Sequence, residues 1–159
     1  SDKLRFFAAV AALVALDQIY KAAVRQFLPA SASAPVPVFS FVHITHWANT
    51  GSVFGLFQGT SNYIALISLL AVPAVILLYL SGFLKQRLAA TLLVAGLVGN
   101  TIDRLSRGFV TDFIYIRPWP AFNLADAFLT IGTLLLAASY LLPLLPNVLR
   151  KSKKQEKRQ

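Results

Sequence analysis

The sequence has no cysteine and very few acidic residues. Among its 159 residues, 15 are lysine or arginine and six are aspartate or glutamate, which gives a net charge of +9. The absence of cysteine excludes disulfides, thiolate metal sites and a cysteine nucleophile. Charged residues make up 13% of the chain, whereas a soluble domain carries roughly a quarter. This shortage of charge argues against a water-soluble domain.

Apolar residues take the place of the missing charge. They make up 57% of the chain, and the mean hydropathy is +0.65. Four apolar stretches reach or approach the roughly 20 residues that a helix needs to cross a bilayer; they are residues 4–28, 63–83, 88–102 and 125–145. No signal-peptide cleavage site follows the first stretch, so we expect a retained helix. The sequence predicts a mainly α membrane protein, with one four-helix domain at 1–149 and a basic tail at 150–159.

The basic residues predict the orientation of the chain. If four helices alternate across a membrane, ten of the lysines and arginines fall on the side that holds both termini, and five fall on the other. By the positive-inside rule, both termini are then cytoplasmic. The tail KSKKQEKR fits a surface anchor on anionic lipid better than a nucleic-acid-binding segment, and no nucleic-acid partner is expected.

Two segments rich in aromatic and β-branched residues predict a small β-sheet on the outer side. They are residues 37–57, which begin PVFSFVHITHW, and residues 108–119, which read GFVTDFIYIRPW. Aromatic side chains at this level suit the membrane–water interface. The long segment 29–62 could also cover a site there as a lid.

Four of the six acidic residues are expected at the outer ends of helices or in the loop between the third and fourth helices, where ionisable groups are costly and indicate function. Asp17 lies four residues before Lys21, which favours a simple ion pair. Asp103 lies near the end of its helix, where the dipole disfavours an anion, so it needs Arg104 or Arg107 beside it.

The other two acids are harder to explain as structural. Asp126 falls at the third helical position after Asn123 in FNLAD, as in a capping box, so it could be only a cap. Asp112 lies in a predicted strand among apolar residues and has no cap to make. Two carboxylates brought close can share a proton and activate a water, one acting as general base and the other as general acid. Asp112 and Asp126 suit these roles.

Other hydrolytic designs are poorly supplied. His43 and His46 stand three residues apart on a predicted strand, which places their rings on opposite faces and disfavours a metal site. A serine nucleophile with a lysine base remains open from composition, but no serine stands beside Lys21 in the sequence. No metal and no cofactor are therefore expected.

Five short motifs then occur in the order found in a known family. They are LDQIYK (16–21), NTGSVFGLF (49–57), GNTIDR (99–104), VTDF (110–113) and FNLAD (122–126). With four apolar helices in a chain of this size, the sequence resembles the type II (lipoprotein) signal peptidases. The departures are modest: Val53 replaces the usual alanine, and LVGN (97–100) is less rich in glycine than the family's run.

The resemblance implies an aspartyl peptidase of the bacterial inner membrane that cuts diacylglyceryl-modified prolipoproteins before the lipidated cysteine. It implies that Asp112 and Asp126 are catalytic, that Asn49 and Arg104 help to hold substrate or the peptide-like inhibitor globomycin, and that the outer strands form a cradle over the substrate. We expect a monomer whose site lies near the outer leaflet. The remaining motif positions with site-supporting roles are Asp17, Lys21, Gly51, Asn100, Asp103, Asn123 and Ala125.

Two rival hypotheses use the same acids without catalysis. A small transporter or lipid-binding protein could use them as proton relays or ion pairs, although no internal repeat or pair of Gly/Pro-broken helices appears. A degenerate relative could bind lipoprotein precursors without cutting them, but an intact pair of aspartates argues against it.

Overall fold

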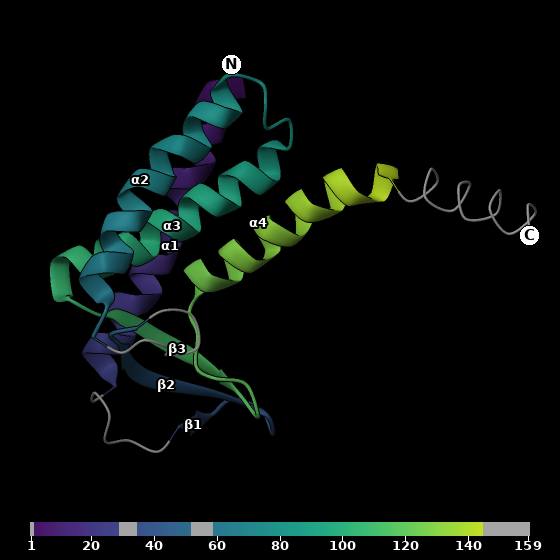
Figure 1. The fold of residues 1–159 in the computed structure, drawn as a ribbon. Coiled ribbons are helices and arrows are strands. Elements are labelled where there is room, and N and C mark those ends of the chain that lie inside the picture. Colours follow the sequence, from purple (N-terminus) through teal and green to yellow (C-terminus); the bar gives the residue numbers. More distant parts are fainter. Residues whose placement is uncertain (1, 29–34, 52–58, 145–159) are drawn as a thin grey trace, which may run out of the picture.

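The structure is a computed structural model and describes residues 2–28, 35–51 and 59–144. The helices run in chain order as α1 (Asp2–Phe27), α2 (Ser61–Leu80), α3 (Arg87–Arg107), α4 (Leu124–Leu141) and a 3-10 turn, η2 (Leu142–Leu144) (Figure 1). The strands are β1 (Val36–Pro37), β2 (Val42–Asn49) and β3 (Val110–Ile116). The predicted basic tail and residues 52–57 of the predicted strand segment lie outside the described residues.

The prediction of four membrane-spanning helices is confirmed, because α1 to α4 are each long and apolar enough to cross a membrane. The third helix continues five residues past the predicted end at 102 and ends at Arg107. Its last turns carry Asp103 and Arg104, which interrupt the apolar run but are buried inside the protein. The second helix ends at Leu80 rather than 83, because the chain turns at Gly82, whose φ is 78°.

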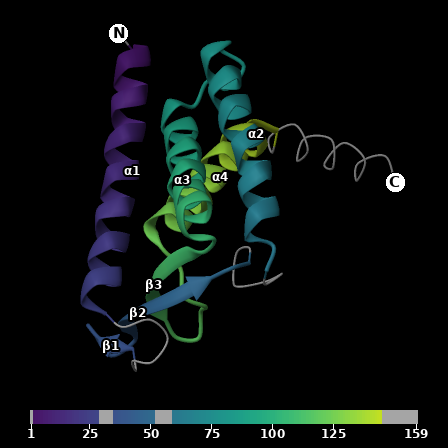
Figure 2. The same cartoon turned by 90° about the vertical axis from the view of Figure 1, so that its left-hand side faces the viewer.

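Helix α3 is the central element of the helical layer. It contacts α1, α2 and α4 (Figure 2). Of its apolar stretch of 18 residues 67% is buried, whereas the corresponding share is 11% in α2 and in α4. Small residues allow this close packing. A Cβ atom on Gly96 would lie 2.5 Å from the Ala125 carbonyl oxygen and 2.6 Å from the Leu129 Cγ. The start of α4 therefore rests directly on the backbone of α3.

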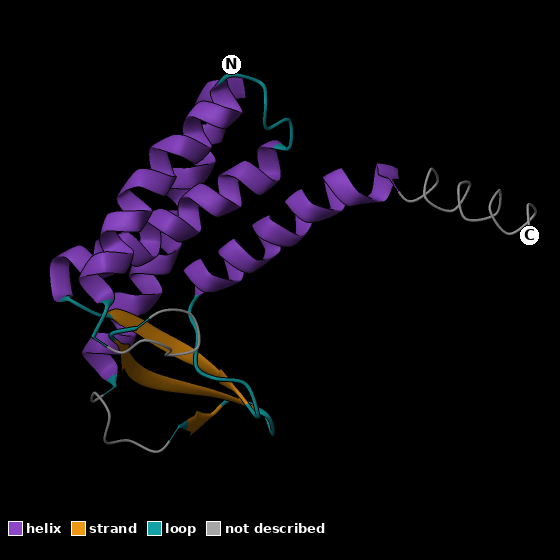
Figure 3. Cartoon of the chain, in the orientation of Figure 1, coloured by secondary structure: helices purple, strands orange, loops and turns teal. Residues whose placement is uncertain are grey.

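The sheet lies at one end of the helices, and the N-terminus lies at the other (Figures 1 and 3). Its strand order is β1-β2-β3, and both pairings are antiparallel. Strand β2 pairs with β3 from Val42–Ile116 to Asn49–Val110, with an irregularity between Ile44 and Trp47. The two aromatic segments therefore form one sheet, as the sequence predicts.

The connection from α3 through β3 to α4 is short and tightly specified. Gly108 adopts a left-handed conformation with φ 79° and donates its N–H to the Arg104 carbonyl at 2.9 Å, which ends α3. After β3 the chain turns back, so that Phe122 and Ile114 exchange backbone hydrogen bonds of 2.8 and 2.9 Å. This return places Asn123, the cap of α4, beside Asp112 of β3.

Candidate active site

Asp112 is a buried carboxylate held by two asparagines. Its side chain leaves β3 with 1% of the residue exposed. Its two oxygens accept hydrogen bonds from the Asn49 Nδ2 at 2.9 Å and from the Asn123 Nδ2 at 2.6 Å. Asn49 is the last residue of β2, where it pairs with Val110. The pairing of β2 with β3 therefore delivers one of the two donors.

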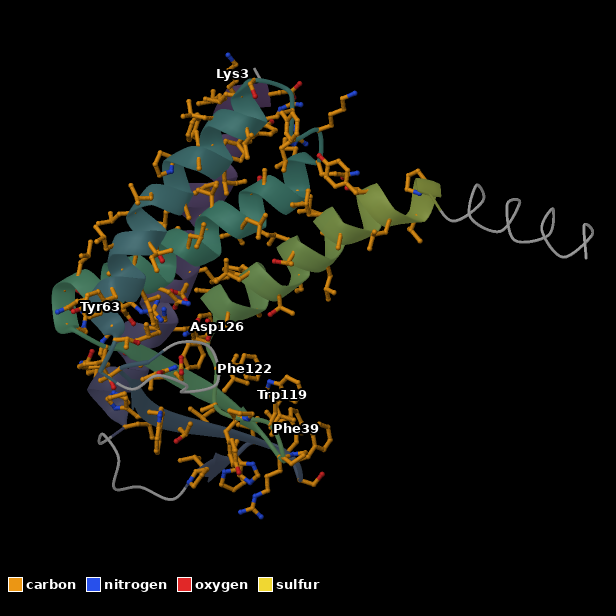
Figure 4. All side chains as sticks on the ribbon, in the orientation of Figure 1. Lys3, Phe39, Tyr63, Trp119, Phe122 and Asp126 are labelled. Carbon is orange, nitrogen blue, oxygen red and sulfur yellow. The ribbon has the colours of Figure 1, made fainter. Side chains whose placement is uncertain are left out.

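Asp126 occupies the first turn of α4, at the end of the helix that faces the sheet (Figure 4). The predicted capping box is confirmed: the Asp126 N–H donates to the Asn123 Oδ1 at 2.9 Å, and the Asn123 N–H donates to the Asp126 Oδ2 at 3.2 Å. The Asp126 Oδ1 also accepts from the Asn100 Nδ2 at 2.8 Å. Asn123 thus contacts both carboxylates and brings them side by side.

The environment of Asp112 favours its neutral form. Burial, and after it the negative charge of Asp126, raise the pKa of Asp112 to about 7, against the opposing effects of the two asparagine hydrogen bonds and the charge of Lys21. Among the described residues, no lysine or arginine nitrogen forms an ion pair with Asp112 or Asp126. The pair can therefore hold one proton near neutral pH.

Asp17 and Asp103 are fully buried and lie among cations. Lys21 is 2.9 Å from Asp17 and 3.6 Å from Asp103, and all three side chains are fully buried. Arg25 and Arg107 each lie 3.4 Å from the Asp103 Oδ1. The predicted pair of Asp17 and Lys21 is confirmed, and Lys21 also donates to the Asn100 Oδ1 at 2.9 Å.

The predicted need of Asp103 for a cation is met by Arg107, not by Arg104. Arg104 instead donates to the Gly51 carbonyl at 3.2 Å. The N–H of Gly51 donates to the Asn49 Oδ1 at 2.9 Å, so these three residues form one connected group. Sequence reasoning missed Lys21 and Arg25 as partners of Asp103, although Arg25 continues the four-residue spacing of Asp17 and Lys21 along α1.

Asp103 and Asp17 also hold the backbone next to Asp112 and Asp126, respectively. The Asp103 Oδ2 accepts the N–H of Thr111 at 3.0 Å, and the Asp17 Oδ1 accepts the N–H of Ala125 at 3.0 Å. Thr111 immediately precedes Asp112, and Ala125 immediately precedes Asp126. Asp103 and Asp17 therefore fix the backbone of the residues that immediately precede Asp112 and Asp126.

Gly99 leaves room for the contact between Asp17 and the backbone of Ala125. A Cβ atom at this position of α3 would lie 2.8 Å from the Asp17 Oδ2 and 3.2 Å from the Ala125 Cβ. The side chain of Asp17 passes through the space that a side chain at 99 would fill. Gln18 closes the same region, since its Nε2 donates to the Gly99 carbonyl at 3.0 Å.

A cavity of about 140 Å³ opens beside Asp126, between α2, α3 and α4 and the edge of the sheet. Since about 10–15 Å³ of such space is enough to hold one water molecule, this cavity has room for several. Its wall combines apolar side chains with amide, guanidinium and carboxylate groups. It is lined by Asn49, Ile64, Ser68, Leu97, Asn100, Arg104, Val110, Asp126 and Leu129.

The structure brings the predicted site residues together through the contacts above. It places the two histidines elsewhere: the His46 Nδ1 lies 2.8 Å from the Leu28 carbonyl oxygen, and His43 packs against Tyr115 with ring centroids 5.9 Å apart. Within residues 2–28, 35–51 and 59–144, no group of three His, Cys, Asp or Glu side chains could hold a metal ion. Lys21 is engaged by two carboxylates and an amide.

Four membrane-spanning helices and two carboxylates bridged by Asn123 beside a cavity define the class of membrane-embedded aspartic enzymes. The model of the signal peptidase (SPase) II family matches residues 9–142. The chain belongs to this family, and it is an aspartic-type membrane peptidase.

Individual relatives agree with this membership. The chain is 37% identical over 136 residues to a lipoprotein signal peptidase of Moorella thermoacetica, covering 82% of this chain and 89% of that protein. It is 40% identical over 133 residues to a lipoprotein signal peptidase of Desulforapulum autotrophicum, covering 76% and 81% of the two chains. A bacterial membrane enzyme solved by the in meso method at 2.3 Å superposes with a TM-score of 0.80 and 28% identity, over 90% of each chain.

Proposed function

We propose that this protein removes the signal peptide from diacylglyceryl-modified prolipoproteins, cutting before the lipidated cysteine with a water activated by Asp112 and Asp126. One observation carries the proposal: the buried carboxylate of Asp112 and the partly buried carboxylate of Asp126 are bridged by Asn123 and have no ion-pair partner among the described residues. A pair of this kind can hold one proton and exchange it, which hydrolysis by an aspartic dyad requires.

The environments of the two acids support different roles. Asp112 carries the proton at the start of the reaction, since burial raises its pKa to about 7. Asp126 lies at the N-terminus of α4, where a negative charge interacts favourably with the helix dipole. Asp126 then acts as general base on the water, and Asp112 protonates the departing amide nitrogen. The two carboxylates titrate as one unit.

The cavity between α2, α3 and α4 is the proposed binding site for the cleaved segment. Arg104 and Asn49 line it and are connected through Gly51, so they can present donors to the backbone carbonyls of an extended peptide. The same cavity would accept globomycin-type peptides. The apolar residues Ile64, Leu97 and Leu129 suit the small apolar parts of a substrate that arrives from the lipid.

The distribution of charge supports an orientation with both termini in the cytoplasm of the bacterial cell and the site near the outer leaflet of its inner membrane. Lys3 lies at the opposite end of the molecule from the sheet (Figure 4). Arg87, at the start of α3, reaches Asp2 there at 3.1 Å. We further propose that residues 1–149 act as a single monomeric domain and that 150–159 bind anionic lipid.

The orientation can be tested directly because the chain has no cysteine. Lys85→Cys and Arg117→Cys place single thiols on exposed positions at the two ends. A membrane-impermeant maleimide applied to the periplasmic side should label Cys-substituted position 117 and spare position 85. The reverse labelling would contradict the proposed orientation.

The function itself is tested by cleavage of a purified diacylglyceryl-modified prolipoprotein in detergent. Wild type should release the signal peptide, and globomycin should block the reaction. Asp112→Asn and Asp126→Asn should each lose at least about a thousandfold in rate, as is usual when a member of a catalytic group is removed, while circular dichroism shows an intact helical fold. Asp2→Asn makes the same chemical change at an exposed position and should cleave normally. Full activity in both variants would disprove the dyad.

A further inference from the structure

We propose that Arg25 and Thr111 form a positioning pair that holds Asp112 in its productive geometry. Helix α1 and strand β3 are far apart in the sequence, yet the Arg25 Nη1 donates to the Thr111 Oγ1 at 2.8 Å. Neither residue belongs to the proposed catalytic pair, and neither lines the cavity beside Asp126. The inference rests on the proposed function, because it concerns the same two carboxylates.

Thr111 is held at two points by groups from two different helices. Its hydroxyl accepts from Arg25 of α1, and its backbone N–H donates at 3.0 Å to the Asp103 carboxylate of α3. Arg25 and Asp103 also contact each other at 3.4 Å, so the three residues form a closed triangle. Thr111 is fully buried. A residue fixed at both its side-chain hydroxyl and its backbone N–H leaves the strand little freedom immediately before Asp112.

The residue after Asp112 is also held by α1. The rings of Tyr20 and Phe113 stack with centroids 6.2 Å apart and an interplanar angle of 13°. Helix α1 thus contacts both neighbours of Asp112, one through a charged hydrogen bond and one through an aromatic stack. Asp112 itself contacts only amide donors among the described residues. Its position is set by its neighbours and by the two asparagines.

The burial of Arg25 fits a positioning role better than a purely electrostatic one. Its side chain is 17% exposed, and it shares Asp103 with Lys21 and Arg107. Asp103 would therefore keep cationic partners without Arg25. The contact that Arg25 alone supplies is the one to Thr111. A hydrogen bond with a charged donor is stronger and more directional than a neutral one.

Thr111→Val tests the pair with the smallest change, since it removes only the hydroxyl acceptor and keeps the branched shape. We expect kcat for prolipoprotein cleavage to fall about tenfold, with KM nearly unchanged. A misplacement of 1 Å can lower the rate by about a hundredfold, so a smaller displacement suffices for this loss. Thr111→Ser keeps the hydroxyl and should keep kcat within about twofold of wild type. A loss confined to KM, or full activity of Thr111→Val, would overturn the pair.

The double variant distinguishes a shared contact from two separate effects. Arg25→Gln should lower kcat to a similar extent, and Arg25→Gln combined with Thr111→Val should be no worse than the poorer single variant, because both remove one interaction. Effects that multiply in the double variant would overturn the pair. Arg5→Gln makes the same change at an exposed position of α1 and serves as the control.

The pH profile provides a readout that a loss of folding would not produce. If Thr111→Val loosens Asp112, it weakens the repulsion from Asp126 and admits water, so the alkaline limb of kcat should move to lower pH. An unchanged limb together with an unchanged kcat would overturn the proposal. A wild type that cleaves, with Asp112→Asn inactive and Thr111→Val fully active, would remove the positioning pair and leave the proposed function standing. A wild type that fails to cleave would remove both.

Discussion

Two pairs of aspartates lie next to each other in this protein, and they differ in what surrounds them. Asp17 and Asp103 contact Lys21, and Asp103 also contacts two arginines. Asp112 and Asp126 contact asparagine amides and backbone N–H groups, with no ion pair among the described residues. Asn100 joins the two regions, because it accepts from Lys21 and donates to Asp126.

We propose that this difference separates acids that support the site from acids that react. A buried carboxylate paired with a cation keeps its charge, because the pair compensates the loss of hydration. A buried carboxylate surrounded only by neutral donors and another acid can take up or release a proton near neutral pH. The cation-bound pair is therefore suited to hold the backbone, and the amide-bound pair is suited to proton transfer.

The largest effect on stability should come from the cation-bound pair. Lys21→Met leaves Asp17 buried without its ion-pair partner, and breaking a buried ion pair in this way costs about 3–5 kcal/mol. Unfolding in mixed micelles should show this loss. Lys85→Met removes an exposed lysine between α2 and α3 and should leave the free energy of unfolding unchanged. Equal stability of Lys21→Met and wild type would erase the distinction between the two pairs.

In the amide-bound pair, removing the charge of Asp112 should instead increase the free energy of unfolding at neutral pH. Because the pKa of Asp112 is raised from 3.8 to about 7 in the folded protein, its contribution to stability is fully present below pH 4 and is lost as the pH rises to 7. Asp112→Asn lacks this loss. Between pH 4 and 7 the free energy of unfolding of Asp112→Asn should therefore rise relative to that of wild type by up to about 4 kcal/mol, at about 1.4 kcal/mol per pH unit. Parallel pH profiles for the two proteins would contradict the assignment.

Activity should depend on the same proton. If Asp112 must be protonated to act, kcat should fall about tenfold for each unit above pH 7. Asn49→Ala removes a hydrogen bond that lowers the pKa of Asp112, so the alkaline limb should move to higher pH. A limb that moves to lower pH in this variant would show that another group controls the reaction.

The smallest effect should come from the charges at the opposite end of the molecule. Asp2 lies 3.1 Å from Arg87 and 3.8 Å from Arg5, but its side chain is 77% exposed. Exposed ion pairs add little because water and salt already screen the charges. Asp2→Asn should leave both the melting temperature and the cleavage rate unchanged. A clear loss of stability would mean that burial does not explain the contrast between the ion pairs.

Local patterns predicted the parts of the fold that depend on local forces. Apolar run length gave the four helices, strand composition gave the sheet, and FNLAD gave the cap of α4. The third helix was predicted too short, because Asp103 and Arg104 interrupt the apolar run that marks a membrane span. These side chains are polar because they face other polar side chains inside the protein, which hydropathy alone cannot show.

Partners across the fold were out of reach of local patterns. The contacts of Asp103 with Arg25 and of Thr111 with Arg25 join residues 78 and 86 positions apart. Spacing along α1 could have identified Arg25, because it lies one further turn along from Lys21. Thr111 carries no such signal, since a threonine in a strand is ordinary. Its role depends on the sheet being placed against α1, which only tertiary structure defines.

The narrow space at Gly99 has an evolutionary consequence. Since a Cβ atom there would lie 2.8 Å from the Asp17 carboxylate, positions 99 and 17 cannot vary independently. Among descendants of a common ancestor, a larger residue at 99 should be accompanied by a shorter side chain at 17, with the hydrogen bond to Ala125 lost at the same time. Lineages that retain peptidase activity should therefore inherit the two positions as a unit. Gly99, which has no side chain to place in the site, should covary with the site as closely as the residues inside it.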